Sequence, residues 1–438
     1  MLVEFSVENF RSIKKEQTIS LLATKSKEHP ENLIAYSDSS KFNILRSAVI
    51  YGANASGKTN ILKALENLVY FILFSTDLKL EQKIPSYKPH KLDNAYHDQP
   101  TKFQIEFIGP SNVRYRYLIH FTANEVIREE LLFYPKKQEA ILFSREKGKK
   151  IKFGNYLTGR KKNIEAELLP NNLFLSKAAN SNLEHLQKIY IYFLETFVFK
   201  MKDELRFTGV ETTRKMTDTT DSSFSDKVSL FLKSVDTGIS SLKVVKTEFK
   251  DDAFFDSFPK DMPKHIVDDI RTQISLRPMT SHRLYDNDNE VGMIDFDIAE
   301  ESDGTNKLYS LSSDIITALL NGSVYVIDEI DNSLHPHITE FIIKLFNNPR
   351  INKKNAQLIT ATHDSSLLNP NLVRRDQIWF TNKVRNGSTE LYSLVEFNKD
   401  EVRAKTPYND WYLSGRFSAV PVIDKNVYSI FEDCDSVQ

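Results

Sequence analysis

The alternation of apolar and polar residues over residues 2–8, LVEFSVE, predicts a half-buried β-strand, because successive side chains of a strand point to opposite faces. Residues 17–22 predict a second strand paired with it, and the polar residues 24–40 predict a loop. The short apolar run 44–51 ends at a Gly-containing turn and predicts a buried strand of a parallel sheet. The helical spacing of apolar residues over 61–73 predicts a helix after it.

The next part of the chain predicts a second, antiparallel sheet. The stretch 103–121 has the pattern of a β-hairpin, and 126–133 and 141–153 continue the β-rich pattern. Residues 183–203 have the apolar spacing of a helix. The α/β class follows from these elements together.

The region beyond this helix predicts an inserted, mostly helical subdomain. Residues 211–226 are rich in Thr, Ser and Asp and predict a flexible connection, whereas 228–235 and 266–274 predict helices. A further helical pattern over 308–320 leads into the apolar run 324–327.

The composition is that of an ordinary globular protein, with 40% hydrophobic and 27% charged residues and a formal net charge of -1. The single cysteine, Cys434, excludes a disulfide framework and a cysteine-rich zinc site. The first residues are too acidic for a signal peptide, and no apolar run is long enough to span a bilayer. We therefore expect a cytoplasmic protein without a membrane partner.

Residues 52–59, GANASGKT, match the pattern G-x-x-x-x-G-K-[ST], with an apolar strand before them and a helical pattern after them. The glycines permit the tight turn that brings backbone N–H groups to phosphates. We expect Lys58 to reach the β- and γ-phosphates and the Thr59 hydroxyl to ligate Mg²⁺. ATP and Mg²⁺ are thus the predicted cofactors, and the residues predicted here to bind ATP are Gly52, Asn54, Ser56, Gly57, Lys58, Thr59 and Asn60.

Residues 324–329, VYVIDE, predict a strand of the same sheet that ends in two carboxylates. Ligands of open α/β sheets bind at the carboxyl ends of the strands. We expect Asp328 to hold Mg²⁺ and Glu329 to act as the general base on the attacking water.

Two further elements carry candidate chemistry. Ser302 and Gly304 open the helical pattern that leads into the Asp-Glu strand, and small residues at a helix start can bind an anion. Residues 357–363, QLITATH, predict a strand that ends in His363, which we expect to sense the γ-phosphate or to stabilise the transition state.

The order of these elements resembles the ATPase heads of the ABC, SMC and RecF-like families. The resemblance implies an ABC-type P-loop head with a mixed central sheet, flanking helices and an antiparallel β subdomain. It also implies that Ser302 and Gly304 form the signature motif, which completes the ATP site of the opposite protomer, and that residues 331–336 form the D-loop. Arg11 lies where DNA-repair members place an arginine that contacts phosphate, although an ordinary strand-end charge explains it equally well.

The resemblance implies three parts of the chain. Residues 1–180 are the expected N-terminal part of the head with the phosphate loop and the β subdomain. Residues 181–280 are the expected helical insertion, and 281–438 are the expected C-terminal part with the signature, the Asp-Glu strand and the histidine. The Q-loop glutamine of the family has two candidates, Gln99 and Gln104.

Four stretches resemble, more closely, the AAA family ATPases of bacterial phage-defence operons of the RloA or AbiL kind, which are related to the ATPase domain of OLD proteins. They are MLVEFSVENFRSI at the start, ESDGT at 301–305, THDSSLL at 362–368 and YLSGRFSAVP at 412–421. This resemblance implies a switch in abortive infection that controls a separate effector, such as a Toprim-type nuclease of the RloB kind or another toxin. Only 75 residues of the sequence follow His363, and part of them must complete the sheet, so we expect no Toprim domain within this stretch.

Residues 136–162 are strongly basic, with Phe143, Phe153 and Tyr156 interleaved, so nucleic acid is a further candidate partner. A solvated hairpin with lysines on exposed edges explains the same pattern slightly better. The sequence thus leaves three hypotheses: a dimeric ATPase of phage defence, a DNA-repair or DNA-maintenance ATPase of the RecF or SMC type, and a scaffold that holds ATP to organise a toxin or nuclease. The absence of a long heptad region disfavours the second.

Overall fold

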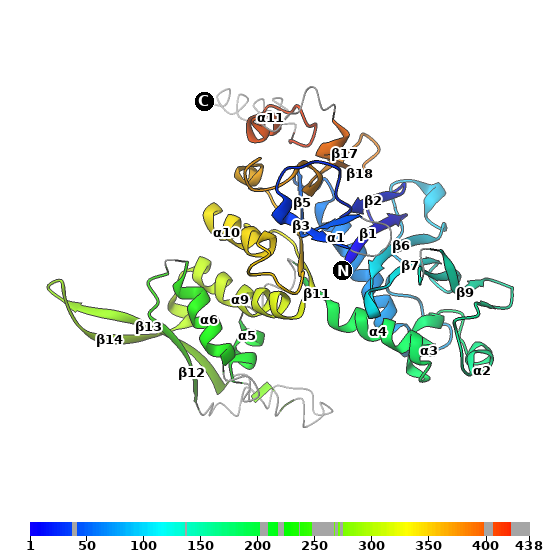
Figure 1. The fold of residues 1–438 in the computed structure, drawn as a ribbon, viewed down its shortest axis with the longest axis horizontal. Helices are drawn as coiled ribbons and strands as arrows, with labels where there is room; N and C mark the ends of the chain where they lie inside the picture. Colours follow the sequence, from blue (N-terminus) through cyan, green and yellow to red (C-terminus); the bar gives the residue numbers. More distant parts are fainter. Residues whose placement is uncertain are drawn as a thin grey trace, which may run out of the picture.

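The computed structural model describes residues 1–36, 42–135, 138–201, 209–217, 223–235, 237–247, 267, 270–271, 275–397 and 406–421. Two large sheets dominate this part of the chain, with helices between them and on the outer face of one (Figure 1). The class is therefore α/β, with a mixed central sheet and a separate antiparallel sheet, as the sequence predicts.

The central sheet has six strands in the order β11-β15-β16-β5-β17-β18. The first five run parallel, and β18 pairs antiparallel with β17 at one edge. Their bounds are β5 (Ser47–Gly52), β11 (Phe197–Lys200), β15 (Val324–Ile327), β16 (Gln357–Ala361), β17 (Ile378–Lys383) and β18 (Thr389–Ser393). The carboxyl ends of the parallel strands meet at one edge, where open α/β sheets bind ligands.

Each face of the central sheet has its own core. Ala48 and Ile50 of β5 belong to the core on one face, and Val49 and Tyr51 to the core on the other. This alternation explains why the strand reads as a continuous apolar run, because both of its faces are buried. The second core includes α9 (Asp303–Asn321), α10 (Pro336–Asn347) and α11 (Tyr408–Leu413).

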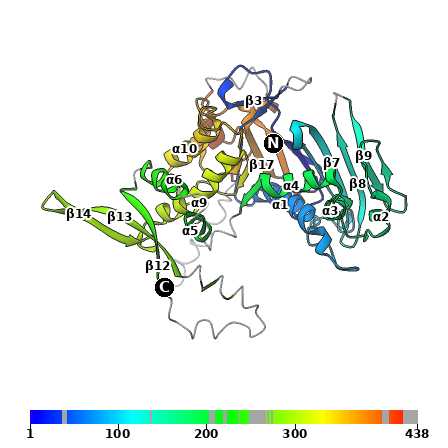
Figure 2. The ribbon, with the colours of Figure 1, turned by 60° about the horizontal axis from the view of Figure 1, so that its bottom comes forward.

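The helix α1 (Lys58–Phe74) lies between the two sheets (Figure 2). The antiparallel sheet beyond it has the order β10-β9-β8-β7-β6-β1-β2. Phe71 of α1 packs against Phe121 of this sheet with ring centroids 5.0 Å apart. The strands are β1 (Leu2–Glu8), β2 (Gln17–Ser20), β6 (Thr101–Ile108), β7 (Arg114–Phe121), β8 (Val126–Phe133), β9 (Ala140–Glu146) and β10 (Lys152–Phe153).

Three helices lie beside this sheet (Figure 2): α2 (Lys161–Ala166), α3 (Phe174–Asn180) and α4 (Glu184–Thr196). Glu129 of β8 is fully buried, and its carboxylate accepts hydrogen bonds from the backbone N–H groups of Phe174 and Leu175 at 2.7 and 2.9 Å. A carboxylate at a helix N-terminus satisfies donors that have no partner within the helix. Glu129 therefore fixes the start of α3 against the sheet.

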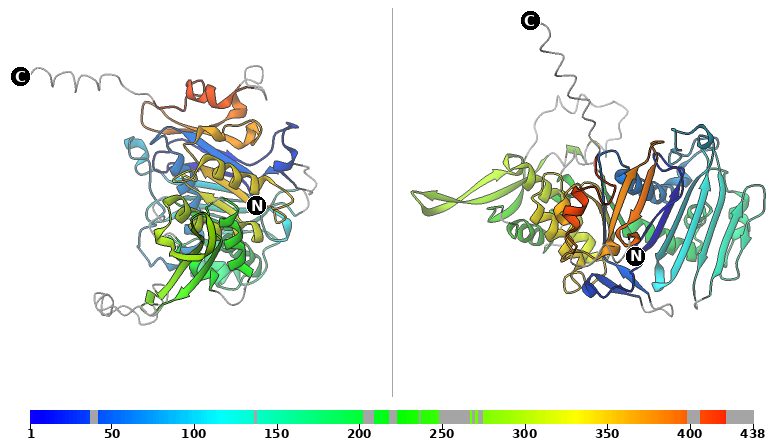
Figure 3. Two further views of the ribbon diagram at one scale, coloured as in Figure 1. Left: turned by 90° about the vertical axis from the view of Figure 1, so that its left-hand side faces the viewer. Right: turned by 90° about the horizontal axis from the view of Figure 1, so that it is seen from above.

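The region between β11 and α9 combines helices with a small sheet. The helices α5 (Val210–Met216) and α6 (Ser223–Lys233) pack on α9. The strands β12 (Ser241–Lys246), β13 (Leu276–Asp286) and β14 (Asn289–Asp297) form a three-stranded antiparallel sheet. The β13–β14 hairpin projects away from the rest of the molecule (Figure 3, right).

Several sequence predictions were wrong in detail. The predicted helix 183–203 ends at Thr196, because residues 197–200 pair in parallel with β15. Residues 210–216 form α5 where a flexible connection was predicted, and the predicted loop 24–40 contains β3 (Leu33–Ala35), which pairs with β4 (Asn43–Leu45). The β13–β14 hairpin was not predicted from the sequence.

Some predictions fall outside the described residues. They include Cys434 and most of the predicted helix 266–274. Among the described residues, no helix combines the length and the apolar character that crossing a membrane requires.

Candidate active site at the carboxyl edge of the central sheet

The predicted phosphate-binding loop joins the carboxyl end of β5 to the first turn of α1. Its two end glycines have positive φ values, 154° at Gly52 and 113° at Gly57. A Cβ atom would lie 2.4 Å from the Thr381 hydroxyl oxygen at Gly52 and 2.0 Å from the Thr389 hydroxyl oxygen at Gly57. Only glycine fits both positions, so the backbone turns as closely as a phosphate cradle requires.

The middle of the loop is open to solvent, and its end is fixed from behind. Asn54 and Ala55 are exposed, and Ala55 has a φ of 60°. Ser56 is buried; its hydroxyl lies 2.6 Å from that of Thr381, and its carbonyl accepts a hydrogen bond of 2.8 Å from Thr389. Among the predicted ATP-binding residues, Ser56 therefore turns its side chain toward β17 rather than toward the open side.

Lys58 lies folded back into the loop. Its Nζ donates hydrogen bonds to the carbonyls of Gly52 at 2.7 Å and Ala53 at 3.1 Å. The same Nζ is 3.5 Å from Nδ1 of His363, the residue predicted after β16. The structure thus brings together the predicted lysine and histidine from positions 305 residues apart.

The predicted Mg²⁺ ligands also meet. The Thr59 hydroxyl donates a hydrogen bond of 2.8 Å to Oδ2 of Asp328. Asp328 has no exposed surface, and its backbone N–H donates to the carbonyl of Lys200 at 3.0 Å. A hydroxyl and a carboxylate, both oxygen donors, next to a phosphate cradle suit the hard cation Mg²⁺.

Glu329 follows Asp328 at the end of β15 and has a φ of 50°. Positive φ is uncommon for a residue with a side chain, and such conformations gather at functional sites. The next residues tie β15 to β16, since Ile330 N–H donates to the carbonyl of Ala361 at 3.2 Å. The Asp331 carboxylate accepts from the backbone N–H of His363 at 3.2 Å.

The predicted signature residues lie at the N-terminus of α9, beside the D-loop of the same chain. Ser302 is exposed and caps α9, because its Oγ accepts a hydrogen bond of 3.2 Å from the Thr305 N–H. A Cβ atom at Gly304 would lie 3.0 Å from the Ser333 carbonyl oxygen. The signature thus packs closely on residues 331–334 and leaves Ser302 facing solvent.

Lys307 of α9 was missed by the sequence reasoning. Its side chain is only 6% exposed, and its Nζ has no hydrogen-bond partner in the described part of the chain. Burial and the nearby Lys200 together lower its pKa to about 8, although the carboxylates of Glu329, Asp331 and Asp328 oppose the shift. Lys307 therefore brings a buried cation from the signature helix to the acidic end of β15.

A basic cleft of about 480 Å³ adjoins the phosphate loop. Arg11, Lys88, Lys91 and Lys383 line it together with Ser12, Tyr87 and Leu92. Ser12 Oγ accepts a hydrogen bond of 2.7 Å from Asn60 of α1, so the cleft touches the first turn of the P-loop helix. Arg11 Nε is buried with no hydrogen-bond partner among the described residues. Of these residues the sequence singled out only Arg11 and Asn60, because Lys88 and Lys91 lie in a different segment from Arg11, and Lys383 lies in a third.

Three of the eight cations that the structure describes in the basic stretch 136–162 form ion pairs. Arg145 pairs with the buried Glu129 at 3.4 Å, Lys147 with Glu125 at 2.6 Å, and Lys149 with Glu146 at 2.8 Å. Two of its three aromatic residues, Phe143 and Phe153, pack on Phe174. These contacts favour the solvated hairpin over a nucleic-acid surface.

The stretch 412–421 supports the phosphate-loop strand from behind. The ring of Tyr412 contacts that of Tyr51 at a centroid distance of 6.1 Å and stacks on Phe380 at 5.9 Å. Neither Gln99 nor Gln104 joins the site by a described contact: the Gln99 carbonyl accepts from Asn9, and Gln104 lies within β6.

Taken together, the cradle at Gly52 and Gly57, the Lys58 ammonium and the Thr59–Asp328 oxygen pair fit ATP with Mg²⁺. Among the described residues, no group of three or more His, Cys, Asp or Glu side chains suggests another metal site.

The chain matches one family of known domains, and it is similar to several solved structures. No curated protein matches the chain. Similar solved structures include an SMC head bound to the C-terminal winged-helix domain of ScpA, with 13% identity, coverage of 90% of this chain and 97% of that one, and a TM-score of 0.44. They also include the SMC head domain from Thermotoga maritima, with 12% identity, coverage of 90% and 98%, and a TM-score of 0.37. The recombination mediator protein RecF is similar as well, with 11% identity, coverage of 89% and 98%, and a TM-score of 0.34.

A family profile matches residues 47–369, which is well over half of the chain and spans the phosphate loop, the Asp-Glu strand and His363. On this match, the chain belongs to the AAA domain family described as "AAA domain, putative AbiEii toxin, Type IV TA system".

Proposed function

We propose that this protein is an ABC/SMC-like ATPase that binds and hydrolyses ATP and acts as a switch in bacterial anti-phage defence. The observation that carries the ATPase proposal is the contact between Thr59 and Asp328, at 2.8 Å, beside the Lys58 ammonium. Three residues from two distant motifs converge on one point next to a backbone cradle, as phosphoryl transfer requires.

In this proposal the loop holds the phosphates by its backbone N–H groups, and Lys58 exchanges its contacts with the Gly52 and Ala53 carbonyls for phosphate oxygens. Thr59 and Asp328 hold Mg²⁺, which neutralises the charge that develops on the phosphates. Arg11, in the basic cleft beside the first turn of α1, supplies an additional cation for the phosphates. Glu329 accepts the proton of the attacking water, and His363 contacts the γ-phosphate beside Lys58.

The proposed hydrolytic unit is a homodimer. The exposed position of Ser302, at the start of a helix and packed on the D-loop through Gly304, supports a contact with the nucleotide of a second protomer. Each ATP then lies between the phosphate loop of one protomer and the signature of its partner. We further propose that a separate protein, a nuclease or another toxin, is the effector that this dimer controls.

The alternative is a DNA-maintenance ATPase. The pairing of Arg145 with the buried Glu129 argues against a DNA contact by Arg145, because a cation held by a buried carboxylate is less available to phosphates. The two proposals differ in one observable, since a DNA-maintenance ATPase is stimulated by DNA in a salt-dependent way.

The direct test is Mg²⁺-dependent ATP turnover of the purified protein, with and without duplex DNA. Lys58→Ala is expected to abolish nucleotide binding and turnover, whereas Lys233→Ala, at an exposed position of α6, is expected to leave both unchanged. Turnover that survives in Lys58→Ala would refute the proposed site. Turnover that rises with DNA and falls with salt would favour the DNA-maintenance alternative.

A further inference from the structure

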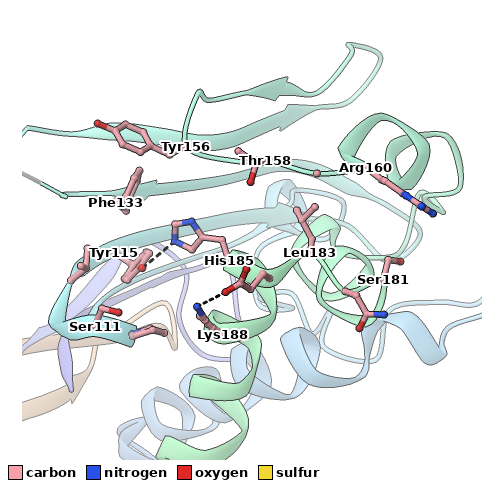
Figure 4. Close-up of a pocket in the computed structure, with 15 residues that line it drawn as sticks. Ser111, Tyr115, Phe133, Tyr156, Thr158, Arg160, Ser181, Leu183, His185 and Lys188 are labelled. Carbon is pink, nitrogen blue, oxygen red and sulfur yellow. Dashed lines mark hydrogen bonds and ion pairs between the residues drawn. The ribbon is translucent and has the colours of Figure 1, made fainter.

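A second cavity lies far along the chain from the phosphate loop, where the N-terminus of α4 meets the antiparallel sheet (Figure 4). Its volume is about 800 Å³, within the range of small-molecule sites, and no residue of the phosphate loop lines it. Its walls come from β7, β8, the loop after β10 and the first turns of α4.

One end of this cavity is aromatic. Tyr115 and Phe133 are cross-strand neighbours whose nearly parallel rings have centroids 6.1 Å apart. Both are almost fully buried, and Phe133 supports the ring of Tyr156 edge-on at 5.0 Å. Tyr156 itself is 55% exposed. The Tyr156 ring therefore has an open face at the mouth of the cavity, while Tyr115 and Phe133 are packed below it.

The aromatic end also has a neutral polar edge. His185 lies between the two layers, with its ring 5.5 Å from that of Phe133 and its Nε2 3.2 Å from the Tyr115 hydroxyl. Burial lowers the pKa of His185, and the nearby Lys188 lowers it further, while Glu184 and a hydrogen bond with the backbone of Tyr156 partly oppose the shift. At neutral pH the imidazole is uncharged, and both of its ring nitrogens are engaged, one with the Tyr115 hydroxyl and the other with the Tyr156 backbone, so His185 holds the segment that carries Tyr156 against the sheet.

The opposite end of the cavity is cationic. Arg160 lies at the end away from Tyr156, near Ser181, as Figure 4 shows, and it forms no ion pair with a described residue. Lys188 of α4 lines the cavity below His185 (Figure 4) and pairs with Glu184 at 2.7 Å, with 58% of its side chain exposed. An exposed pair of this kind is weak and exchanges readily for a stronger anion.

We propose that this cavity binds a nucleotide, with its base stacked on Tyr156 and its phosphate facing Arg160 and Lys188. A flat ring joined to an anion matches, in one ligand, the aromatic end that His185 supports and the cationic end. The chemistry is shared by a free nucleotide and by the phosphorylated end of a single strand, and the test below separates the two.

The helix α4 connects this cavity to the ATP site. Its first turn lines the cavity, the hydroxyl of Tyr190 in its middle donates to the Leu73 carbonyl of α1 at 2.7 Å, and its C-terminus continues into β11 beside the Asp-Glu strand. We expect the bound nucleotide to change ATP turnover through this helix. That second step rests on the proposed function, whereas binding to the cavity does not.

The test is isothermal titration of the full chain with adenosine and uridine 5′-monophosphates and with a 5′-phosphorylated single-stranded tetranucleotide. Tyr156→Ala removes the stacking face and is expected to weaken binding by roughly tenfold or more. Tyr285→Ala is its matched control, because Tyr285 is 54% exposed on the distant β13–β14 hairpin. Lys188→Ala is also expected to weaken binding, and Lys344→Ala is its control, since Lys344 is 60% exposed in a similar helical pair with Glu340.

Saturable binding that falls in Tyr156→Ala and Lys188→Ala but not in the two controls would support the site. Tighter binding of the tetranucleotide than of the monophosphates would identify a strand end as the source, and equal binding would identify a free nucleotide. No saturable binding of any probe, binding unchanged in Tyr156→Ala, or equal affinity for the unphosphorylated nucleosides would overturn the proposal. If the wild-type protein binds the nucleotide in a way that depends on Tyr156 but does not turn over ATP, only the proposed function is contradicted.

Discussion

The Thr59 hydroxyl donates a hydrogen bond of 2.8 Å to the Asp328 carboxylate, although the two residues are 269 positions apart in the chain. Thr59 belongs to the first turn of α1, and Asp328 follows the end of β15. Their strands β5 and β15 are not neighbours, because β16 lies between them. The contact therefore spans the carboxyl edge of the central sheet and defines the place of the proposed Mg²⁺.

Thr59→Ala is expected to weaken Mg²⁺-dependent ATP binding by at least about tenfold, ~1.4 kcal/mol, because one oxygen ligand is lost while the loop keeps its backbone. Thr59→Ser is the matched control, since it keeps the hydroxyl. Titration with ATP at several Mg²⁺ concentrations measures both. Equal Mg²⁺ dependence in Thr59→Ala and wild type would remove Thr59 from the cation site.

The proposed role of Ser302 in the site of the partner predicts complementation between two inactive variants. Lys58→Ala lacks the phosphate-loop cation, and Ser302→Arg blocks the signature. In a mixed dimer, the intact loop of one protomer meets the intact signature of the other. An equal mixture is expected to recover about a quarter of wild-type ATP turnover, because half of the dimers are mixed and each has one intact site of two.

Turnover of the mixture and of each variant alone measures this complementation. Two Ser302→Arg protomers or two Lys58→Ala protomers have no intact site, so each variant alone serves as the control. Recovery would support the composite site, whereas a mixture as inactive as its components would argue that Ser302 acts within its own chain.

The buried pair Arg374–Asp376 predicts a large effect on stability. Their side chains are 1% and 4% exposed, and two hydrogen bonds of 2.8 Å join them. Asp376 also accepts hydrogen bonds from the N–H and hydroxyl of Thr24. Asp376→Ala leaves the guanidinium buried without its carboxylate, so we expect a loss of ~3–5 kcal/mol in the free energy of unfolding.

Urea denaturation measures this loss. Glu211→Ala is the control, because Glu211 forms an exposed helical pair with Arg214, and such pairs contribute only ~0.3–0.5 kcal/mol. Similar effects of the two substitutions would contradict the account of the buried pair.

His120 predicts a pH dependence of stability. Burial lowers the pKa of His120 from 6.5 to about 4, together with Lys102 and Arg128, which lie opposite it on the two neighbouring strands. Between these two pH values the unfolded chain binds a proton that the folded chain does not. The stability present above pH 6.5 is therefore lost progressively as the pH falls toward about 4.

His120→Gln is expected to flatten the fall of the urea midpoint between pH 7 and pH 5, because it removes the titrating group. His337→Gln, at a position 84% exposed on α10, controls for the loss of a histidine. A fall of the midpoint that is equally steep in His120→Gln and wild type would contradict this assignment.

Local sequence patterns predicted the elements that carry the proposed site. The apolar runs of β5 and β15 predict buried parallel strands, because both faces of such strands are covered. Each glycine of the GxxxxGKT loop stands where a Cβ atom would clash. The loop, the Asp-Glu strand and the strand before His363 all lie where these patterns predict them.

The remaining features depend on tertiary contacts that local patterns do not contain. Residues 197–200 continue a helical pattern but pair with β15, so the sheet decides their conformation. Lys307 is buried near Lys200 and the carboxylates at the end of β15, and nothing in its own surroundings in the sequence indicates this burial. The basic cleft likewise joins Arg11, Lys88 and Lys383, which become neighbours only in the folded chain.

The central claim, hydrolysis of ATP between two protomers, is tested most directly by ATP turnover and mass of wild type beside Glu329→Gln. The account predicts that Glu329→Gln slows turnover by ~10²–10⁴-fold, keeps ATP binding and accumulates an ATP-bound dimer, because the general base is lost while the phosphate and cation contacts remain. Normal turnover in Glu329→Gln, or a variant that binds ATP and stays monomeric at every protein concentration, would contradict it.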